Sequence, residues 1–185
     1  MKRRVQLRMP RKTHRAWGAE TLRCAVILSL LRGARGQSPC TLYEAEDATA
    51  SNTDNPLRGP SKGWNHEGYT GSGFMDYGAS SGDYLEWNVW ANATWQADAT
   101  WQANATWRYA LSGNNRDLSL SVNGDTVTIP TVRFPGTEFS WRTYKNTTSV
   151  VVTLRSGSNT IRLTANGASG ANLDSMTLCS WREQL

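Results

Sequence analysis

The sequence predicts an all-β domain, an antiparallel β-sandwich or jelly roll, and three observations support this. Short runs rich in Val, Ile, Thr, Tyr and Trp follow one another from Thr41 onward. Gly, Asn, Asp and Ser separate these runs and mark turns between strands. No segment of this part has the periodicity of a long amphipathic helix. Roughly eight short strands with such punctuation are typical of a two-sheet sandwich.

The individual strands are recognised by alternation of apolar and polar side chains. Residues 118–122 alternate in this way, and the chain then turns at Asn123-Gly124 before a second apolar run at 127–129. Because Asn-Gly is favoured in two-residue hairpin turns, this segment is predicted to be a β-hairpin. Further strands are predicted, in chain order, at Tyr84–Val89, Trp107–Leu111, Val150–Leu154, Thr160–Thr164 and Ser175–Cys179.

The first 36 residues differ from the rest in charge. They hold ten of the 20 Lys and Arg residues and one acidic residue, whereas residues 37–185 carry ten basic and 14 acidic side chains. The second part is therefore net acidic, which argues against a nucleic-acid partner. A chain of this length accommodates one folded domain, which we assign to residues 37–185.

Residues 1–36 are predicted to be a signal peptide or another leader, cleaved after Gly36, so that the domain is secreted. The apolar run Ala25–Leu31 is far shorter than the roughly 20 residues that span a bilayer, so no membrane span is expected. The basic stretch is long for a signal peptide. Translation from Met9 and an Arg-rich organellar transit peptide remain alternatives.

Two cysteines, Cys40 and Cys179, stand at opposite ends of the domain, while Cys24 lies in the leader. Export implies an oxidising compartment, so a Cys40–Cys179 disulfide is expected if the first and last strands are neighbours. Such a bridge would contribute about 4–5 kcal/mol on the chain-entropy model. Two buried free thiols are the alternative. Without a CxxC motif or Cys/His cluster, zinc is not indicated.

Two carboxylates, Glu44 and Glu46, alternate on the first predicted strand and so share one face. They fit a hard-cation site, an inverting glycosidase pair or solvent-facing charges on an edge strand. Neighbouring positions on one strand point in parallel and do not flank a scissile bond, which disfavours catalysis. Calcium takes six to eight oxygen ligands and suits a strand with a nearby loop. Asp174, at the start of the last strand, would join this site if the terminal strands pair.

A six-residue repeat places Trp95, Trp101 and Trp107 six residues apart. Because six is even, all three rings would share one face of a continuous strand, either as an aromatic platform for sugars or partly as core. A turn is expected near residues 97–98. We assign Trp107 to the core and leave both roles open for Trp95 and Trp101.

Several motifs resemble carbohydrate-binding module families 35 and 6. They are YEAEDA, GYTGSGFMDYG, GDYLEWNV, WRYAL, LSVNG, GTEFSWRTY, VTLRSGSNTIRL and GANLDSMTL, in this order over about residues 42–178. The resemblance implies a jelly roll of the galactose-binding-like superfamily with a structural Ca²⁺ near the chain ends. It puts Glu44, Glu46 and Asp174 on the metal, with backbone carbonyls near Ser61 and Lys62 completing the shell. The hexapeptide repeat departs from the family pattern, and the register between Trp87 and Trp107 is therefore open.

The resemblance also implies a sugar site in the loops at one end of the sandwich. The principal tryptophan matches Trp141 and the hydrogen-bonding asparagine matches Asn172, while either Tyr69 or Phe74 would be the opposing aromatic residue. Tyr144 stands where a second tryptophan is usual and is expected to pack. An indole suits the C–H face of a pyranose, and an amide suits its hydroxyl edge.

Three sequons, at Asn92, Asn104 and Asn146, predict N-glycosylation and hence solvent exposure in a secreted protein. Glycans at the first two would compete with a sugar platform at the repeat. Lys62, Arg133 and Arg142 are candidate cations for an acidic ligand.

Together these features predict a monomeric, non-catalytic domain that binds polysaccharide or oligosaccharide, with a glycoside hydrolase as a candidate catalytic partner. An extracellular adhesion or matrix domain that binds protein is one alternative, and it would present an apolar patch instead of an aromatic site. An accessory fragment of a glycoside hydrolase is the other. No opposed carboxylate pair or nucleophile–base arrangement is evident, since His66 stands alone in a loop.

Overall fold

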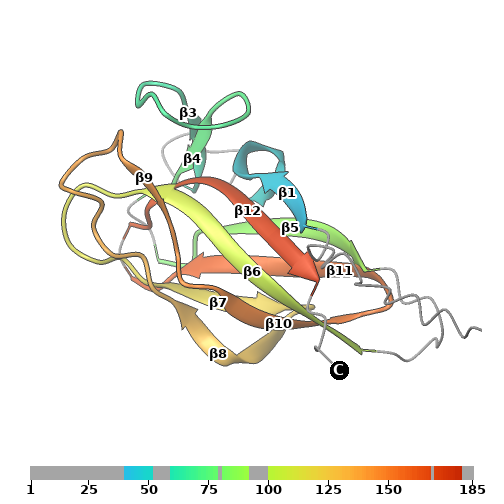
Figure 1. Cartoon of the computed structure of the whole chain (residues 1–185). Helices are drawn as coiled ribbons and strands as arrows, with labels where there is room; N and C mark the ends of the chain where they lie inside the picture. The colour runs from blue at the N-terminus through green and yellow to red at the C-terminus, as the bar shows by residue number, and fades with distance from the viewer. Residues whose placement is uncertain (1–39, 52–58, 79–80, 92–99, 168, 181–185) are drawn as a thin grey trace, which may run out of the picture. The chain divides into compact units, whose positions relative to one another are not determined.

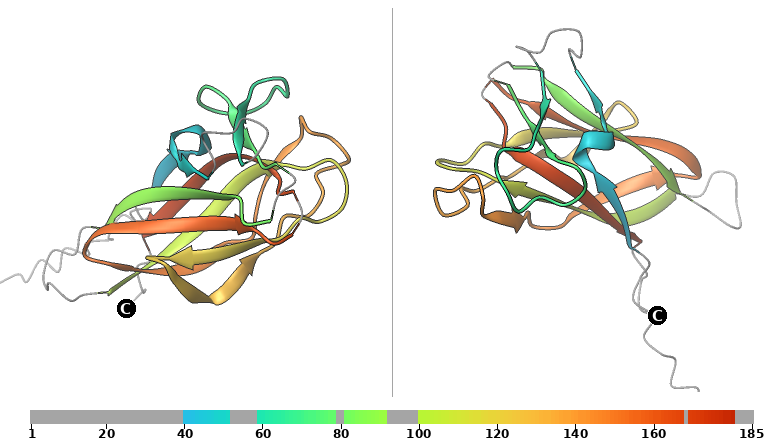
Figure 2. Two further views of the ribbon diagram at one scale, coloured as in Figure 1. Left: turned by 180° about the vertical axis from the view of Figure 1, so that it is seen from behind. Right: turned by 90° about the horizontal axis from the view of Figure 1, so that it is seen from above.

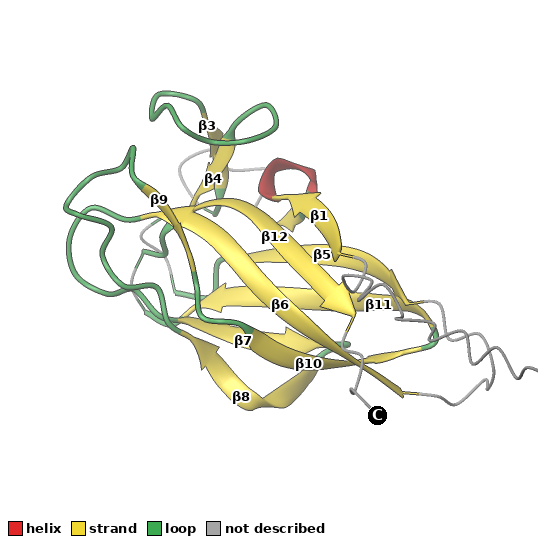
Figure 3. Cartoon of the chain, in the orientation of Figure 1, coloured by secondary structure: helices red, strands yellow, loops and turns green. Residues whose placement is uncertain are grey.

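The computed structural model describes residues 40–51, 59–78, 81–91, 100–167 and 169–180, all within one compact unit of residues 37–185. Two antiparallel sheets form the fold (Figure 1), and Figure 3 shows that strands and loops make up nearly all of the described chain. The predicted antiparallel β-sandwich is confirmed. The predicted leader, residues 1–36, lies outside the described residues, as does the sequon at Asn92.

The larger sheet has seven strands in the order β10-β6-β12-β4-β3, with β1 paired to β12 and β9 paired to β6. The smaller sheet has the order β2-β5-β11-β7-β8. The elements are β1 (Cys40–Glu44), the short 3-10 helix η1 (Ala45–Asp47), β2 (Thr49–Ala50), β3 (Ser61–Gly63), β4 (Phe74–Asp76), β5 (Tyr84–Ala91), β6 (Thr100–Ala110), β7 (Leu118–Val122), β8 (Asp125–Val132), β9 (Tyr144–Asn146), β10 (Val150–Arg155), β11 (Gly157–Ala165) and β12 (Asn172–Ser180).

The predicted strands are found in the structure where apolar and polar side chains alternate over several residues. Strands β5, β7, β10, β11 and β12 contain the predicted segments or overlap them. The β7–β8 hairpin turns at Asn123 and Gly124, whose φ angles of 55° and 81° are those of the expected two-residue turn. Strand β6 begins at Thr100, earlier than the predicted Trp107, because the second unit of the repeat continues the strand.

The core lies between the two sheets and contains the inward side of each alternating strand. Trp107 is fully buried, which confirms its assignment to the core, whereas Trp101 is 37% exposed at the start of the same strand. Both rings are on the inward-facing positions of β6, but Trp101 lies near the end of the sandwich. Trp95 and the predicted turn at residues 97–98 lie outside the described residues.

The terminal strands are neighbours, as the predicted disulfide required. Strand β1 pairs with β12 in a register that puts Cys40 opposite Cys179 (Figure 2). A disulfide joins the two residues, whose Cα atoms are 4.0 Å apart. The bridge therefore closes a loop of 139 residues. No helix among the described residues is long and apolar enough to cross a membrane.

We expect the double variant Cys40→Ser/Cys179→Ser to be less stable by about 3–5 kcal/mol, because opening a loop of this size restores entropy to the unfolded chain. Urea unfolding followed by tryptophan fluorescence measures the change. Replacing both cysteines together avoids a free thiol. An unchanged unfolding midpoint would show that the bridge does not constrain the unfolded state.

Candidate functional site

One end of the larger sheet brings the predicted site residues into a single row. Asn172 of β12 lies opposite Asp76 of β4 and Ala110 of β6, and Ala110 lies opposite Tyr144 of β9. Directly opposed residues of antiparallel strands point to the same face of a sheet. Tyr109, which is the neighbour of Ala110, packs inward, so this row lies on the outer face.

The connection between β3 and β4, residues 64–73, folds over this row, and we name it the covering loop. Three contacts hold it in place. Arg108 donates a hydrogen bond to the carbonyl of Gly68 at 2.7 Å, and the Tyr144 hydroxyl donates one to the carbonyl of His66 at 3.1 Å. The backbone N–H of Thr70 donates to Asp174 Oδ1 at 2.6 Å.

Asp174 is the most deeply buried of these groups, because its side chain has no exposed surface. It stands at a bulge of β12, between Leu173 and Ser175, where the pairing with β6 shifts. The bulge adds one residue to β12, and Asp174 forms an ion pair with Arg108 of β6. The Arg108 guanidinium also lies 4.6 Å from the centre of the Tyr144 ring. Tyr144 thus packs against Arg108, and its role in ligand contact stays a prediction.

Glu44 ends β1 and Glu46 lies in η1, so the prediction that both share one face of a single strand is wrong, because the chain turns into the 3-10 helix between them. Both carboxylates contact the next residues of the covering loop. The Thr70 hydroxyl lies 2.9 Å from Glu44 Oε2, and Ser72 donates its backbone N–H (2.6 Å) and its hydroxyl (3.0 Å) to Glu46 Oε1. Between them Gly71 adopts a φ of 61°, and a Cβ there would lie 2.4 Å from Glu46 Oε1. Glycine is therefore required at this close approach.

The negative charge in this cluster is incompletely neutralised. Burial raises the pKa of Glu44, the charges of Glu46, Asp174 and Asp47 raise it further, and the hydrogen bond from Thr70 opposes the shift. One oxygen of Glu46, Oε2, is buried without a hydrogen-bond partner. The Lys62 ammonium donates to the Ser72 hydroxyl at 2.7 Å instead of pairing with a carboxylate.

The three predicted metal ligands, Glu44, Glu46 and Asp174, all contact the covering loop, but they do not form one tight cluster. Within the described ranges, no group of three or more His, Cys, Asp or Glu side chains has the arrangement of a metal site. Asp174 already accepts hydrogen bonds from Arg108 and Thr70. Glu44 and Glu46 are the carboxylates that remain available for a cation.

The aromatic residues of the site form a connected cluster. The His66 ring stacks at 5.7 Å on Phe74 and at 6.1 Å on Trp141, with interplanar angles of 26° and 20°. Tyr69 lies 6.0 Å from Phe74. Phe74 is buried, whereas Tyr69, His66 and Trp141 are half-buried. Of the two alternatives for the opposing aromatic residue, Phe74 is buried and Tyr69 is partly exposed.

The polar partners of the aromatic cluster are Arg116, Asn172 and Asp76. The Arg116 guanidinium lies 5.3 Å from the centre of the Trp141 ring and donates to the carbonyl of Gly170 at 3.0 Å. Asn172 is 1% exposed, and its amide oxygen has no hydrogen-bond partner. Burial raises the pKa of Asp76, while the charges of Arg116 and His66 oppose the rise.

The sequence predicted Trp141, Asn172 and Tyr69 as site residues, but it did not predict the residues that contact them. His66, read as an isolated loop residue, is the ring between Phe74 and Trp141. Arg108 stood in the motif WRYAL without an assigned role, and Arg116 lay between the motifs WRYAL and LSVNG. Arg108 could have been found as a cation on the outer face of a strand, but its partner is 66 residues away. The other candidate cations, Arg133 and Arg142, are exposed, and so is Asn146 of the third sequon, while Asn104 of β6 is half-buried.

Comparison with solved structures yields close matches over the described domain. The chain is 31% identical to a family 35 carbohydrate-binding module from Clostridium thermocellum, with a TM-score of 0.64, and the match covers 76% of this chain and 98% of that module. It is 32% identical to a CBM35 from Paenibacillus barcinonensis, with a TM-score of 0.63 and coverages of 76% and 99%.

Among curated proteins, the chain is 36% identical over 146 residues to a cycloisomaltooligosaccharide glucanotransferase from Niallia circulans. This match covers 77% of the chain but 13% of the relative's length. The relative's activity therefore belongs to a much longer protein. No family model matches the sequence.

We expect Arg108→Met to lower the free energy of unfolding by about 2–4 kcal/mol, because it leaves the buried Asp174 carboxylate without its cation. Urea unfolding at neutral pH measures this loss. The double variant Arg108→Met/Asp174→Asn should recover part of it, since neither charge then remains.

The matched control is Arg155→Met, which removes an exposed ion pair with Asp125 at 3.5 Å. This control should change stability by less than about 0.5 kcal/mol. Equal effects of the two arginine substitutions would contradict the role given to Arg108.

Proposed function

This chain belongs to family 35 of the carbohydrate-binding modules, and from that premise we infer that it binds carbohydrate at the covering-loop end of the sandwich without catalysing a reaction. Because proteins with the same fold can differ in function, the inference is argued from the residues of the site. The observation that carries the inference is the half-buried aromatic rim of Tyr69, His66 and Trp141, close to the buried and unpartnered amide oxygen of Asn172.

The aromatic rim and the amide suit the two sides of a sugar ring. The C–H face of a pyranose packs on aromatic carbon, while its hydroxyls need donors and acceptors such as an amide and a guanidinium. A ring held between Trp141 and His66 would need a separation of about 7–8 Å, the sum of two van der Waals contacts. Their centroids are 6.1 Å apart. The sugar is therefore proposed to lie on the solvent side of the rim.

The proposed role is attachment to a polysaccharide. The rim offers few rings and few hydrogen bonds to offset the ordering of a polar ligand, so roughly micromolar to millimolar dissociation constants are expected. The chain matches only 13% of a curated carbohydrate-active enzyme. This supports a targeting module that acts with a catalytic partner in a secreted setting.

We also propose a structural Ca²⁺ at Glu44 and Glu46. Two carboxylates that contact Thr70 and Ser72 of the covering loop, one buried oxygen without a partner and a raised pKa at Glu44 fit a hard cation with oxygen ligands. Backbone carbonyls of the neighbouring loop would supply further ligands. When bound, the ion would neutralise the cluster and hold the covering loop. Asp174 is proposed to contribute mainly through its charge.

We expect the domain to be retarded in an affinity gel by one polysaccharide among xylan, mannan, galactan, β-glucan and pectin. Trp141→Ala should abolish the retardation, because it removes the largest ring of the rim. The matched control is Trp90→Ala. This tryptophan lies near the C-terminal end of β5 and is 71% exposed. If Trp90→Ala abolished binding and Trp141→Ala did not, the site would be elsewhere.

Chelation with EDTA should lower the thermal unfolding midpoint of the wild-type domain at neutral pH. Without metal, Glu44→Gln should unfold at a higher temperature than the wild type, because it removes a carboxylate that the fold disfavours in its charged form. The variant should also lose its response to Ca²⁺. Glu67→Gln makes the same change on an exposed residue of the covering loop and should behave like the wild type.

The pH dependence gives an independent check on the Glu44 carboxylate. Its pKa in the folded domain is above the ordinary value of 4.5, so the folded state binds this proton more tightly than the unfolded state does. The charged Glu44 carboxylate lowers the stability of the folded domain. This loss of stability is absent below pH 4.5 and grows as the pH rises from 4.5 through the raised pKa. Without metal, Glu44→Gln should therefore unfold at a higher temperature than the wild type at neutral pH, and this difference should disappear at acidic pH.

A further inference from the structure

The connection between β8 and β9, residues 133–143, borders a groove that the proposed function does not use. Glu138, Phe139 and residues 113–115 line a cleft of about 580 Å³. Tyr109 and residues 145–150 line an adjoining cleft of about 750 Å³. Asn115, Pro135 and Gly136 line both clefts, so the two clefts adjoin, and together we name them the side groove. Within the described chain, neither Trp141 nor the covering loop lines it.

An aromatic ring projects into solvent at the end of the side groove. Phe139 is 84% exposed, and both it and Glu138 have left-handed φ angles of 56° and 58°. Such a conformation costs a residue with a Cβ roughly 1–2 kcal/mol. Ser112 donates its hydroxyl to the Phe139 carbonyl at 2.9 Å and so supports this turn. Strain of this kind concentrates at ligand-contact sites, and burial of Phe139 does not explain it.

The walls of the side groove are fixed to each other before any ligand arrives. Thr137 is fully buried, and its backbone N–H donates to the Leu111 carbonyl at 2.7 Å. Its hydroxyl accepts a hydrogen bond from the Leu111 N–H at 2.8 Å. A Cβ on Gly136 would lie 2.0 Å from the carbonyl oxygen of Gly113, so the two backbones are in direct contact. The groove is therefore preorganised, which lowers the entropic cost of binding.

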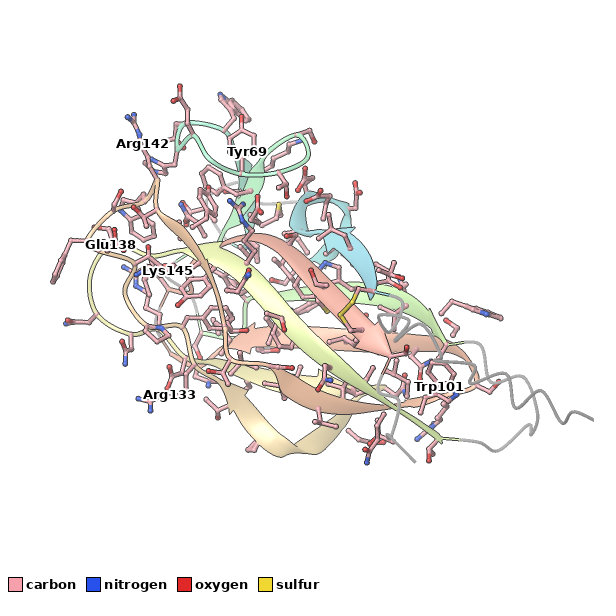
Figure 4. The ribbon with its side chains drawn as sticks, in the orientation of Figure 1. Tyr69, Trp101, Arg133, Glu138, Arg142 and Lys145 are labelled. Atoms are coloured by element: carbon pink, nitrogen blue, oxygen red, sulfur yellow. A yellow bond between two sulfur atoms is a disulfide. The ribbon has the colours of Figure 1, made fainter. Side chains whose placement is uncertain are left out.

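The chemistry of the lining suits a neutral, hydroxyl-rich ligand. Amides of Asn114 and Asn115 and the hydroxyl of Thr148 supply donors and acceptors. Lys145 is neutralised by Glu138 at 2.9 Å, and Arg133 lies 3.9 Å from Asp117. Figure 4 shows Glu138, Lys145 and Arg133 at the loop end of the sandwich, far from Trp101. With its cations paired, the groove offers no excess positive charge to an acidic chain.

We propose that the side groove forms additional subsites for the same glycan, so that the domain binds along an extended neutral polysaccharide chain, with Phe139 stacking on a sugar beyond the one at Trp141. Phe139 and Trp141 are two residues apart, which places their Cα atoms within about 7 Å of each other. One oligosaccharide can therefore contact both rings. This inference rests on the proposed carbohydrate-binding function.

The test is calorimetric titration with β-1,4-linked mannose, xylose and glucose oligosaccharides of one to six units. Protein from a bacterial host keeps Asn146, which lines the groove, free of glycan. The wild type should gain roughly tenfold in affinity between the disaccharide and the hexasaccharide of its preferred sugar, the value of one good aromatic contact. Phe139→Ala should lose that gain and keep disaccharide binding, while Phe139→Tyr should keep both.

The outcomes separate this inference from the function on which it rests. If the wild type bound all lengths equally, or Phe139→Ala retained the gain, the side groove would not be a subsite, although binding at Trp141 would stand. If the wild type bound none of the neutral sugars, none of a parallel oligogalacturonate series and no polysaccharide of the affinity gels, both proposals would fail. A preference for oligogalacturonate would contradict the proposal that the ligand of the side groove is neutral. Since Phe139 is exposed, unchanged thermal unfolding of its variants verifies that they are folded.

Discussion

The buried carboxylate of Asp174 is the constraint on which the functional end of this domain depends. A charge without exposed surface needs opposite charge and hydrogen-bond donors close by. Here the charge comes from Arg108 of β6 and one donor from the backbone of Thr70. Because Thr70 belongs to the covering loop, satisfying Asp174 also decides where that loop lies. The rings of Tyr69 and His66 are placed as a consequence.

The acidic cluster and the aromatic rim are therefore parts of one connected structure. Arg108 pairs with Asp174, contacts the Tyr144 ring and donates to the Gly68 carbonyl, and Tyr144 in turn holds the carbonyl of His66. His66 then stacks on Trp141. The carboxylates are therefore linked to the rings of His66 and Trp141 by a short chain of contacts.

The sequence predicts strands in which apolar and polar side chains alternate. It does not predict contacts between residues that are far apart in the chain. Burial of one sheet face imposes a period of two, which identified β5, β7, β8 and β11 of the smaller sheet and much of β10 and β12. Strand β2, with two residues, was not predicted as a separate strand. Strands β3, β4 and β9 have three residues each, too few for a period to appear. Family resemblance supplied Trp141, Asn172 and Tyr69. The neighbours of these residues depend on pairings across 40 or more positions, such as Arg108 with Gly68, which no local pattern encodes.

Preorganisation explains how so few contacts can serve a binding function. Weak contacts produce useful affinity only if little entropy is lost on ordering the protein. The covering loop is held by hydrogen bonds to the outer face of the sheet, and the β8–β9 connection is held through the buried Thr137. Trp141 is half-buried and packs against the core. The sandwich thus acts as a rigid support, and its loops present rings that are already in place.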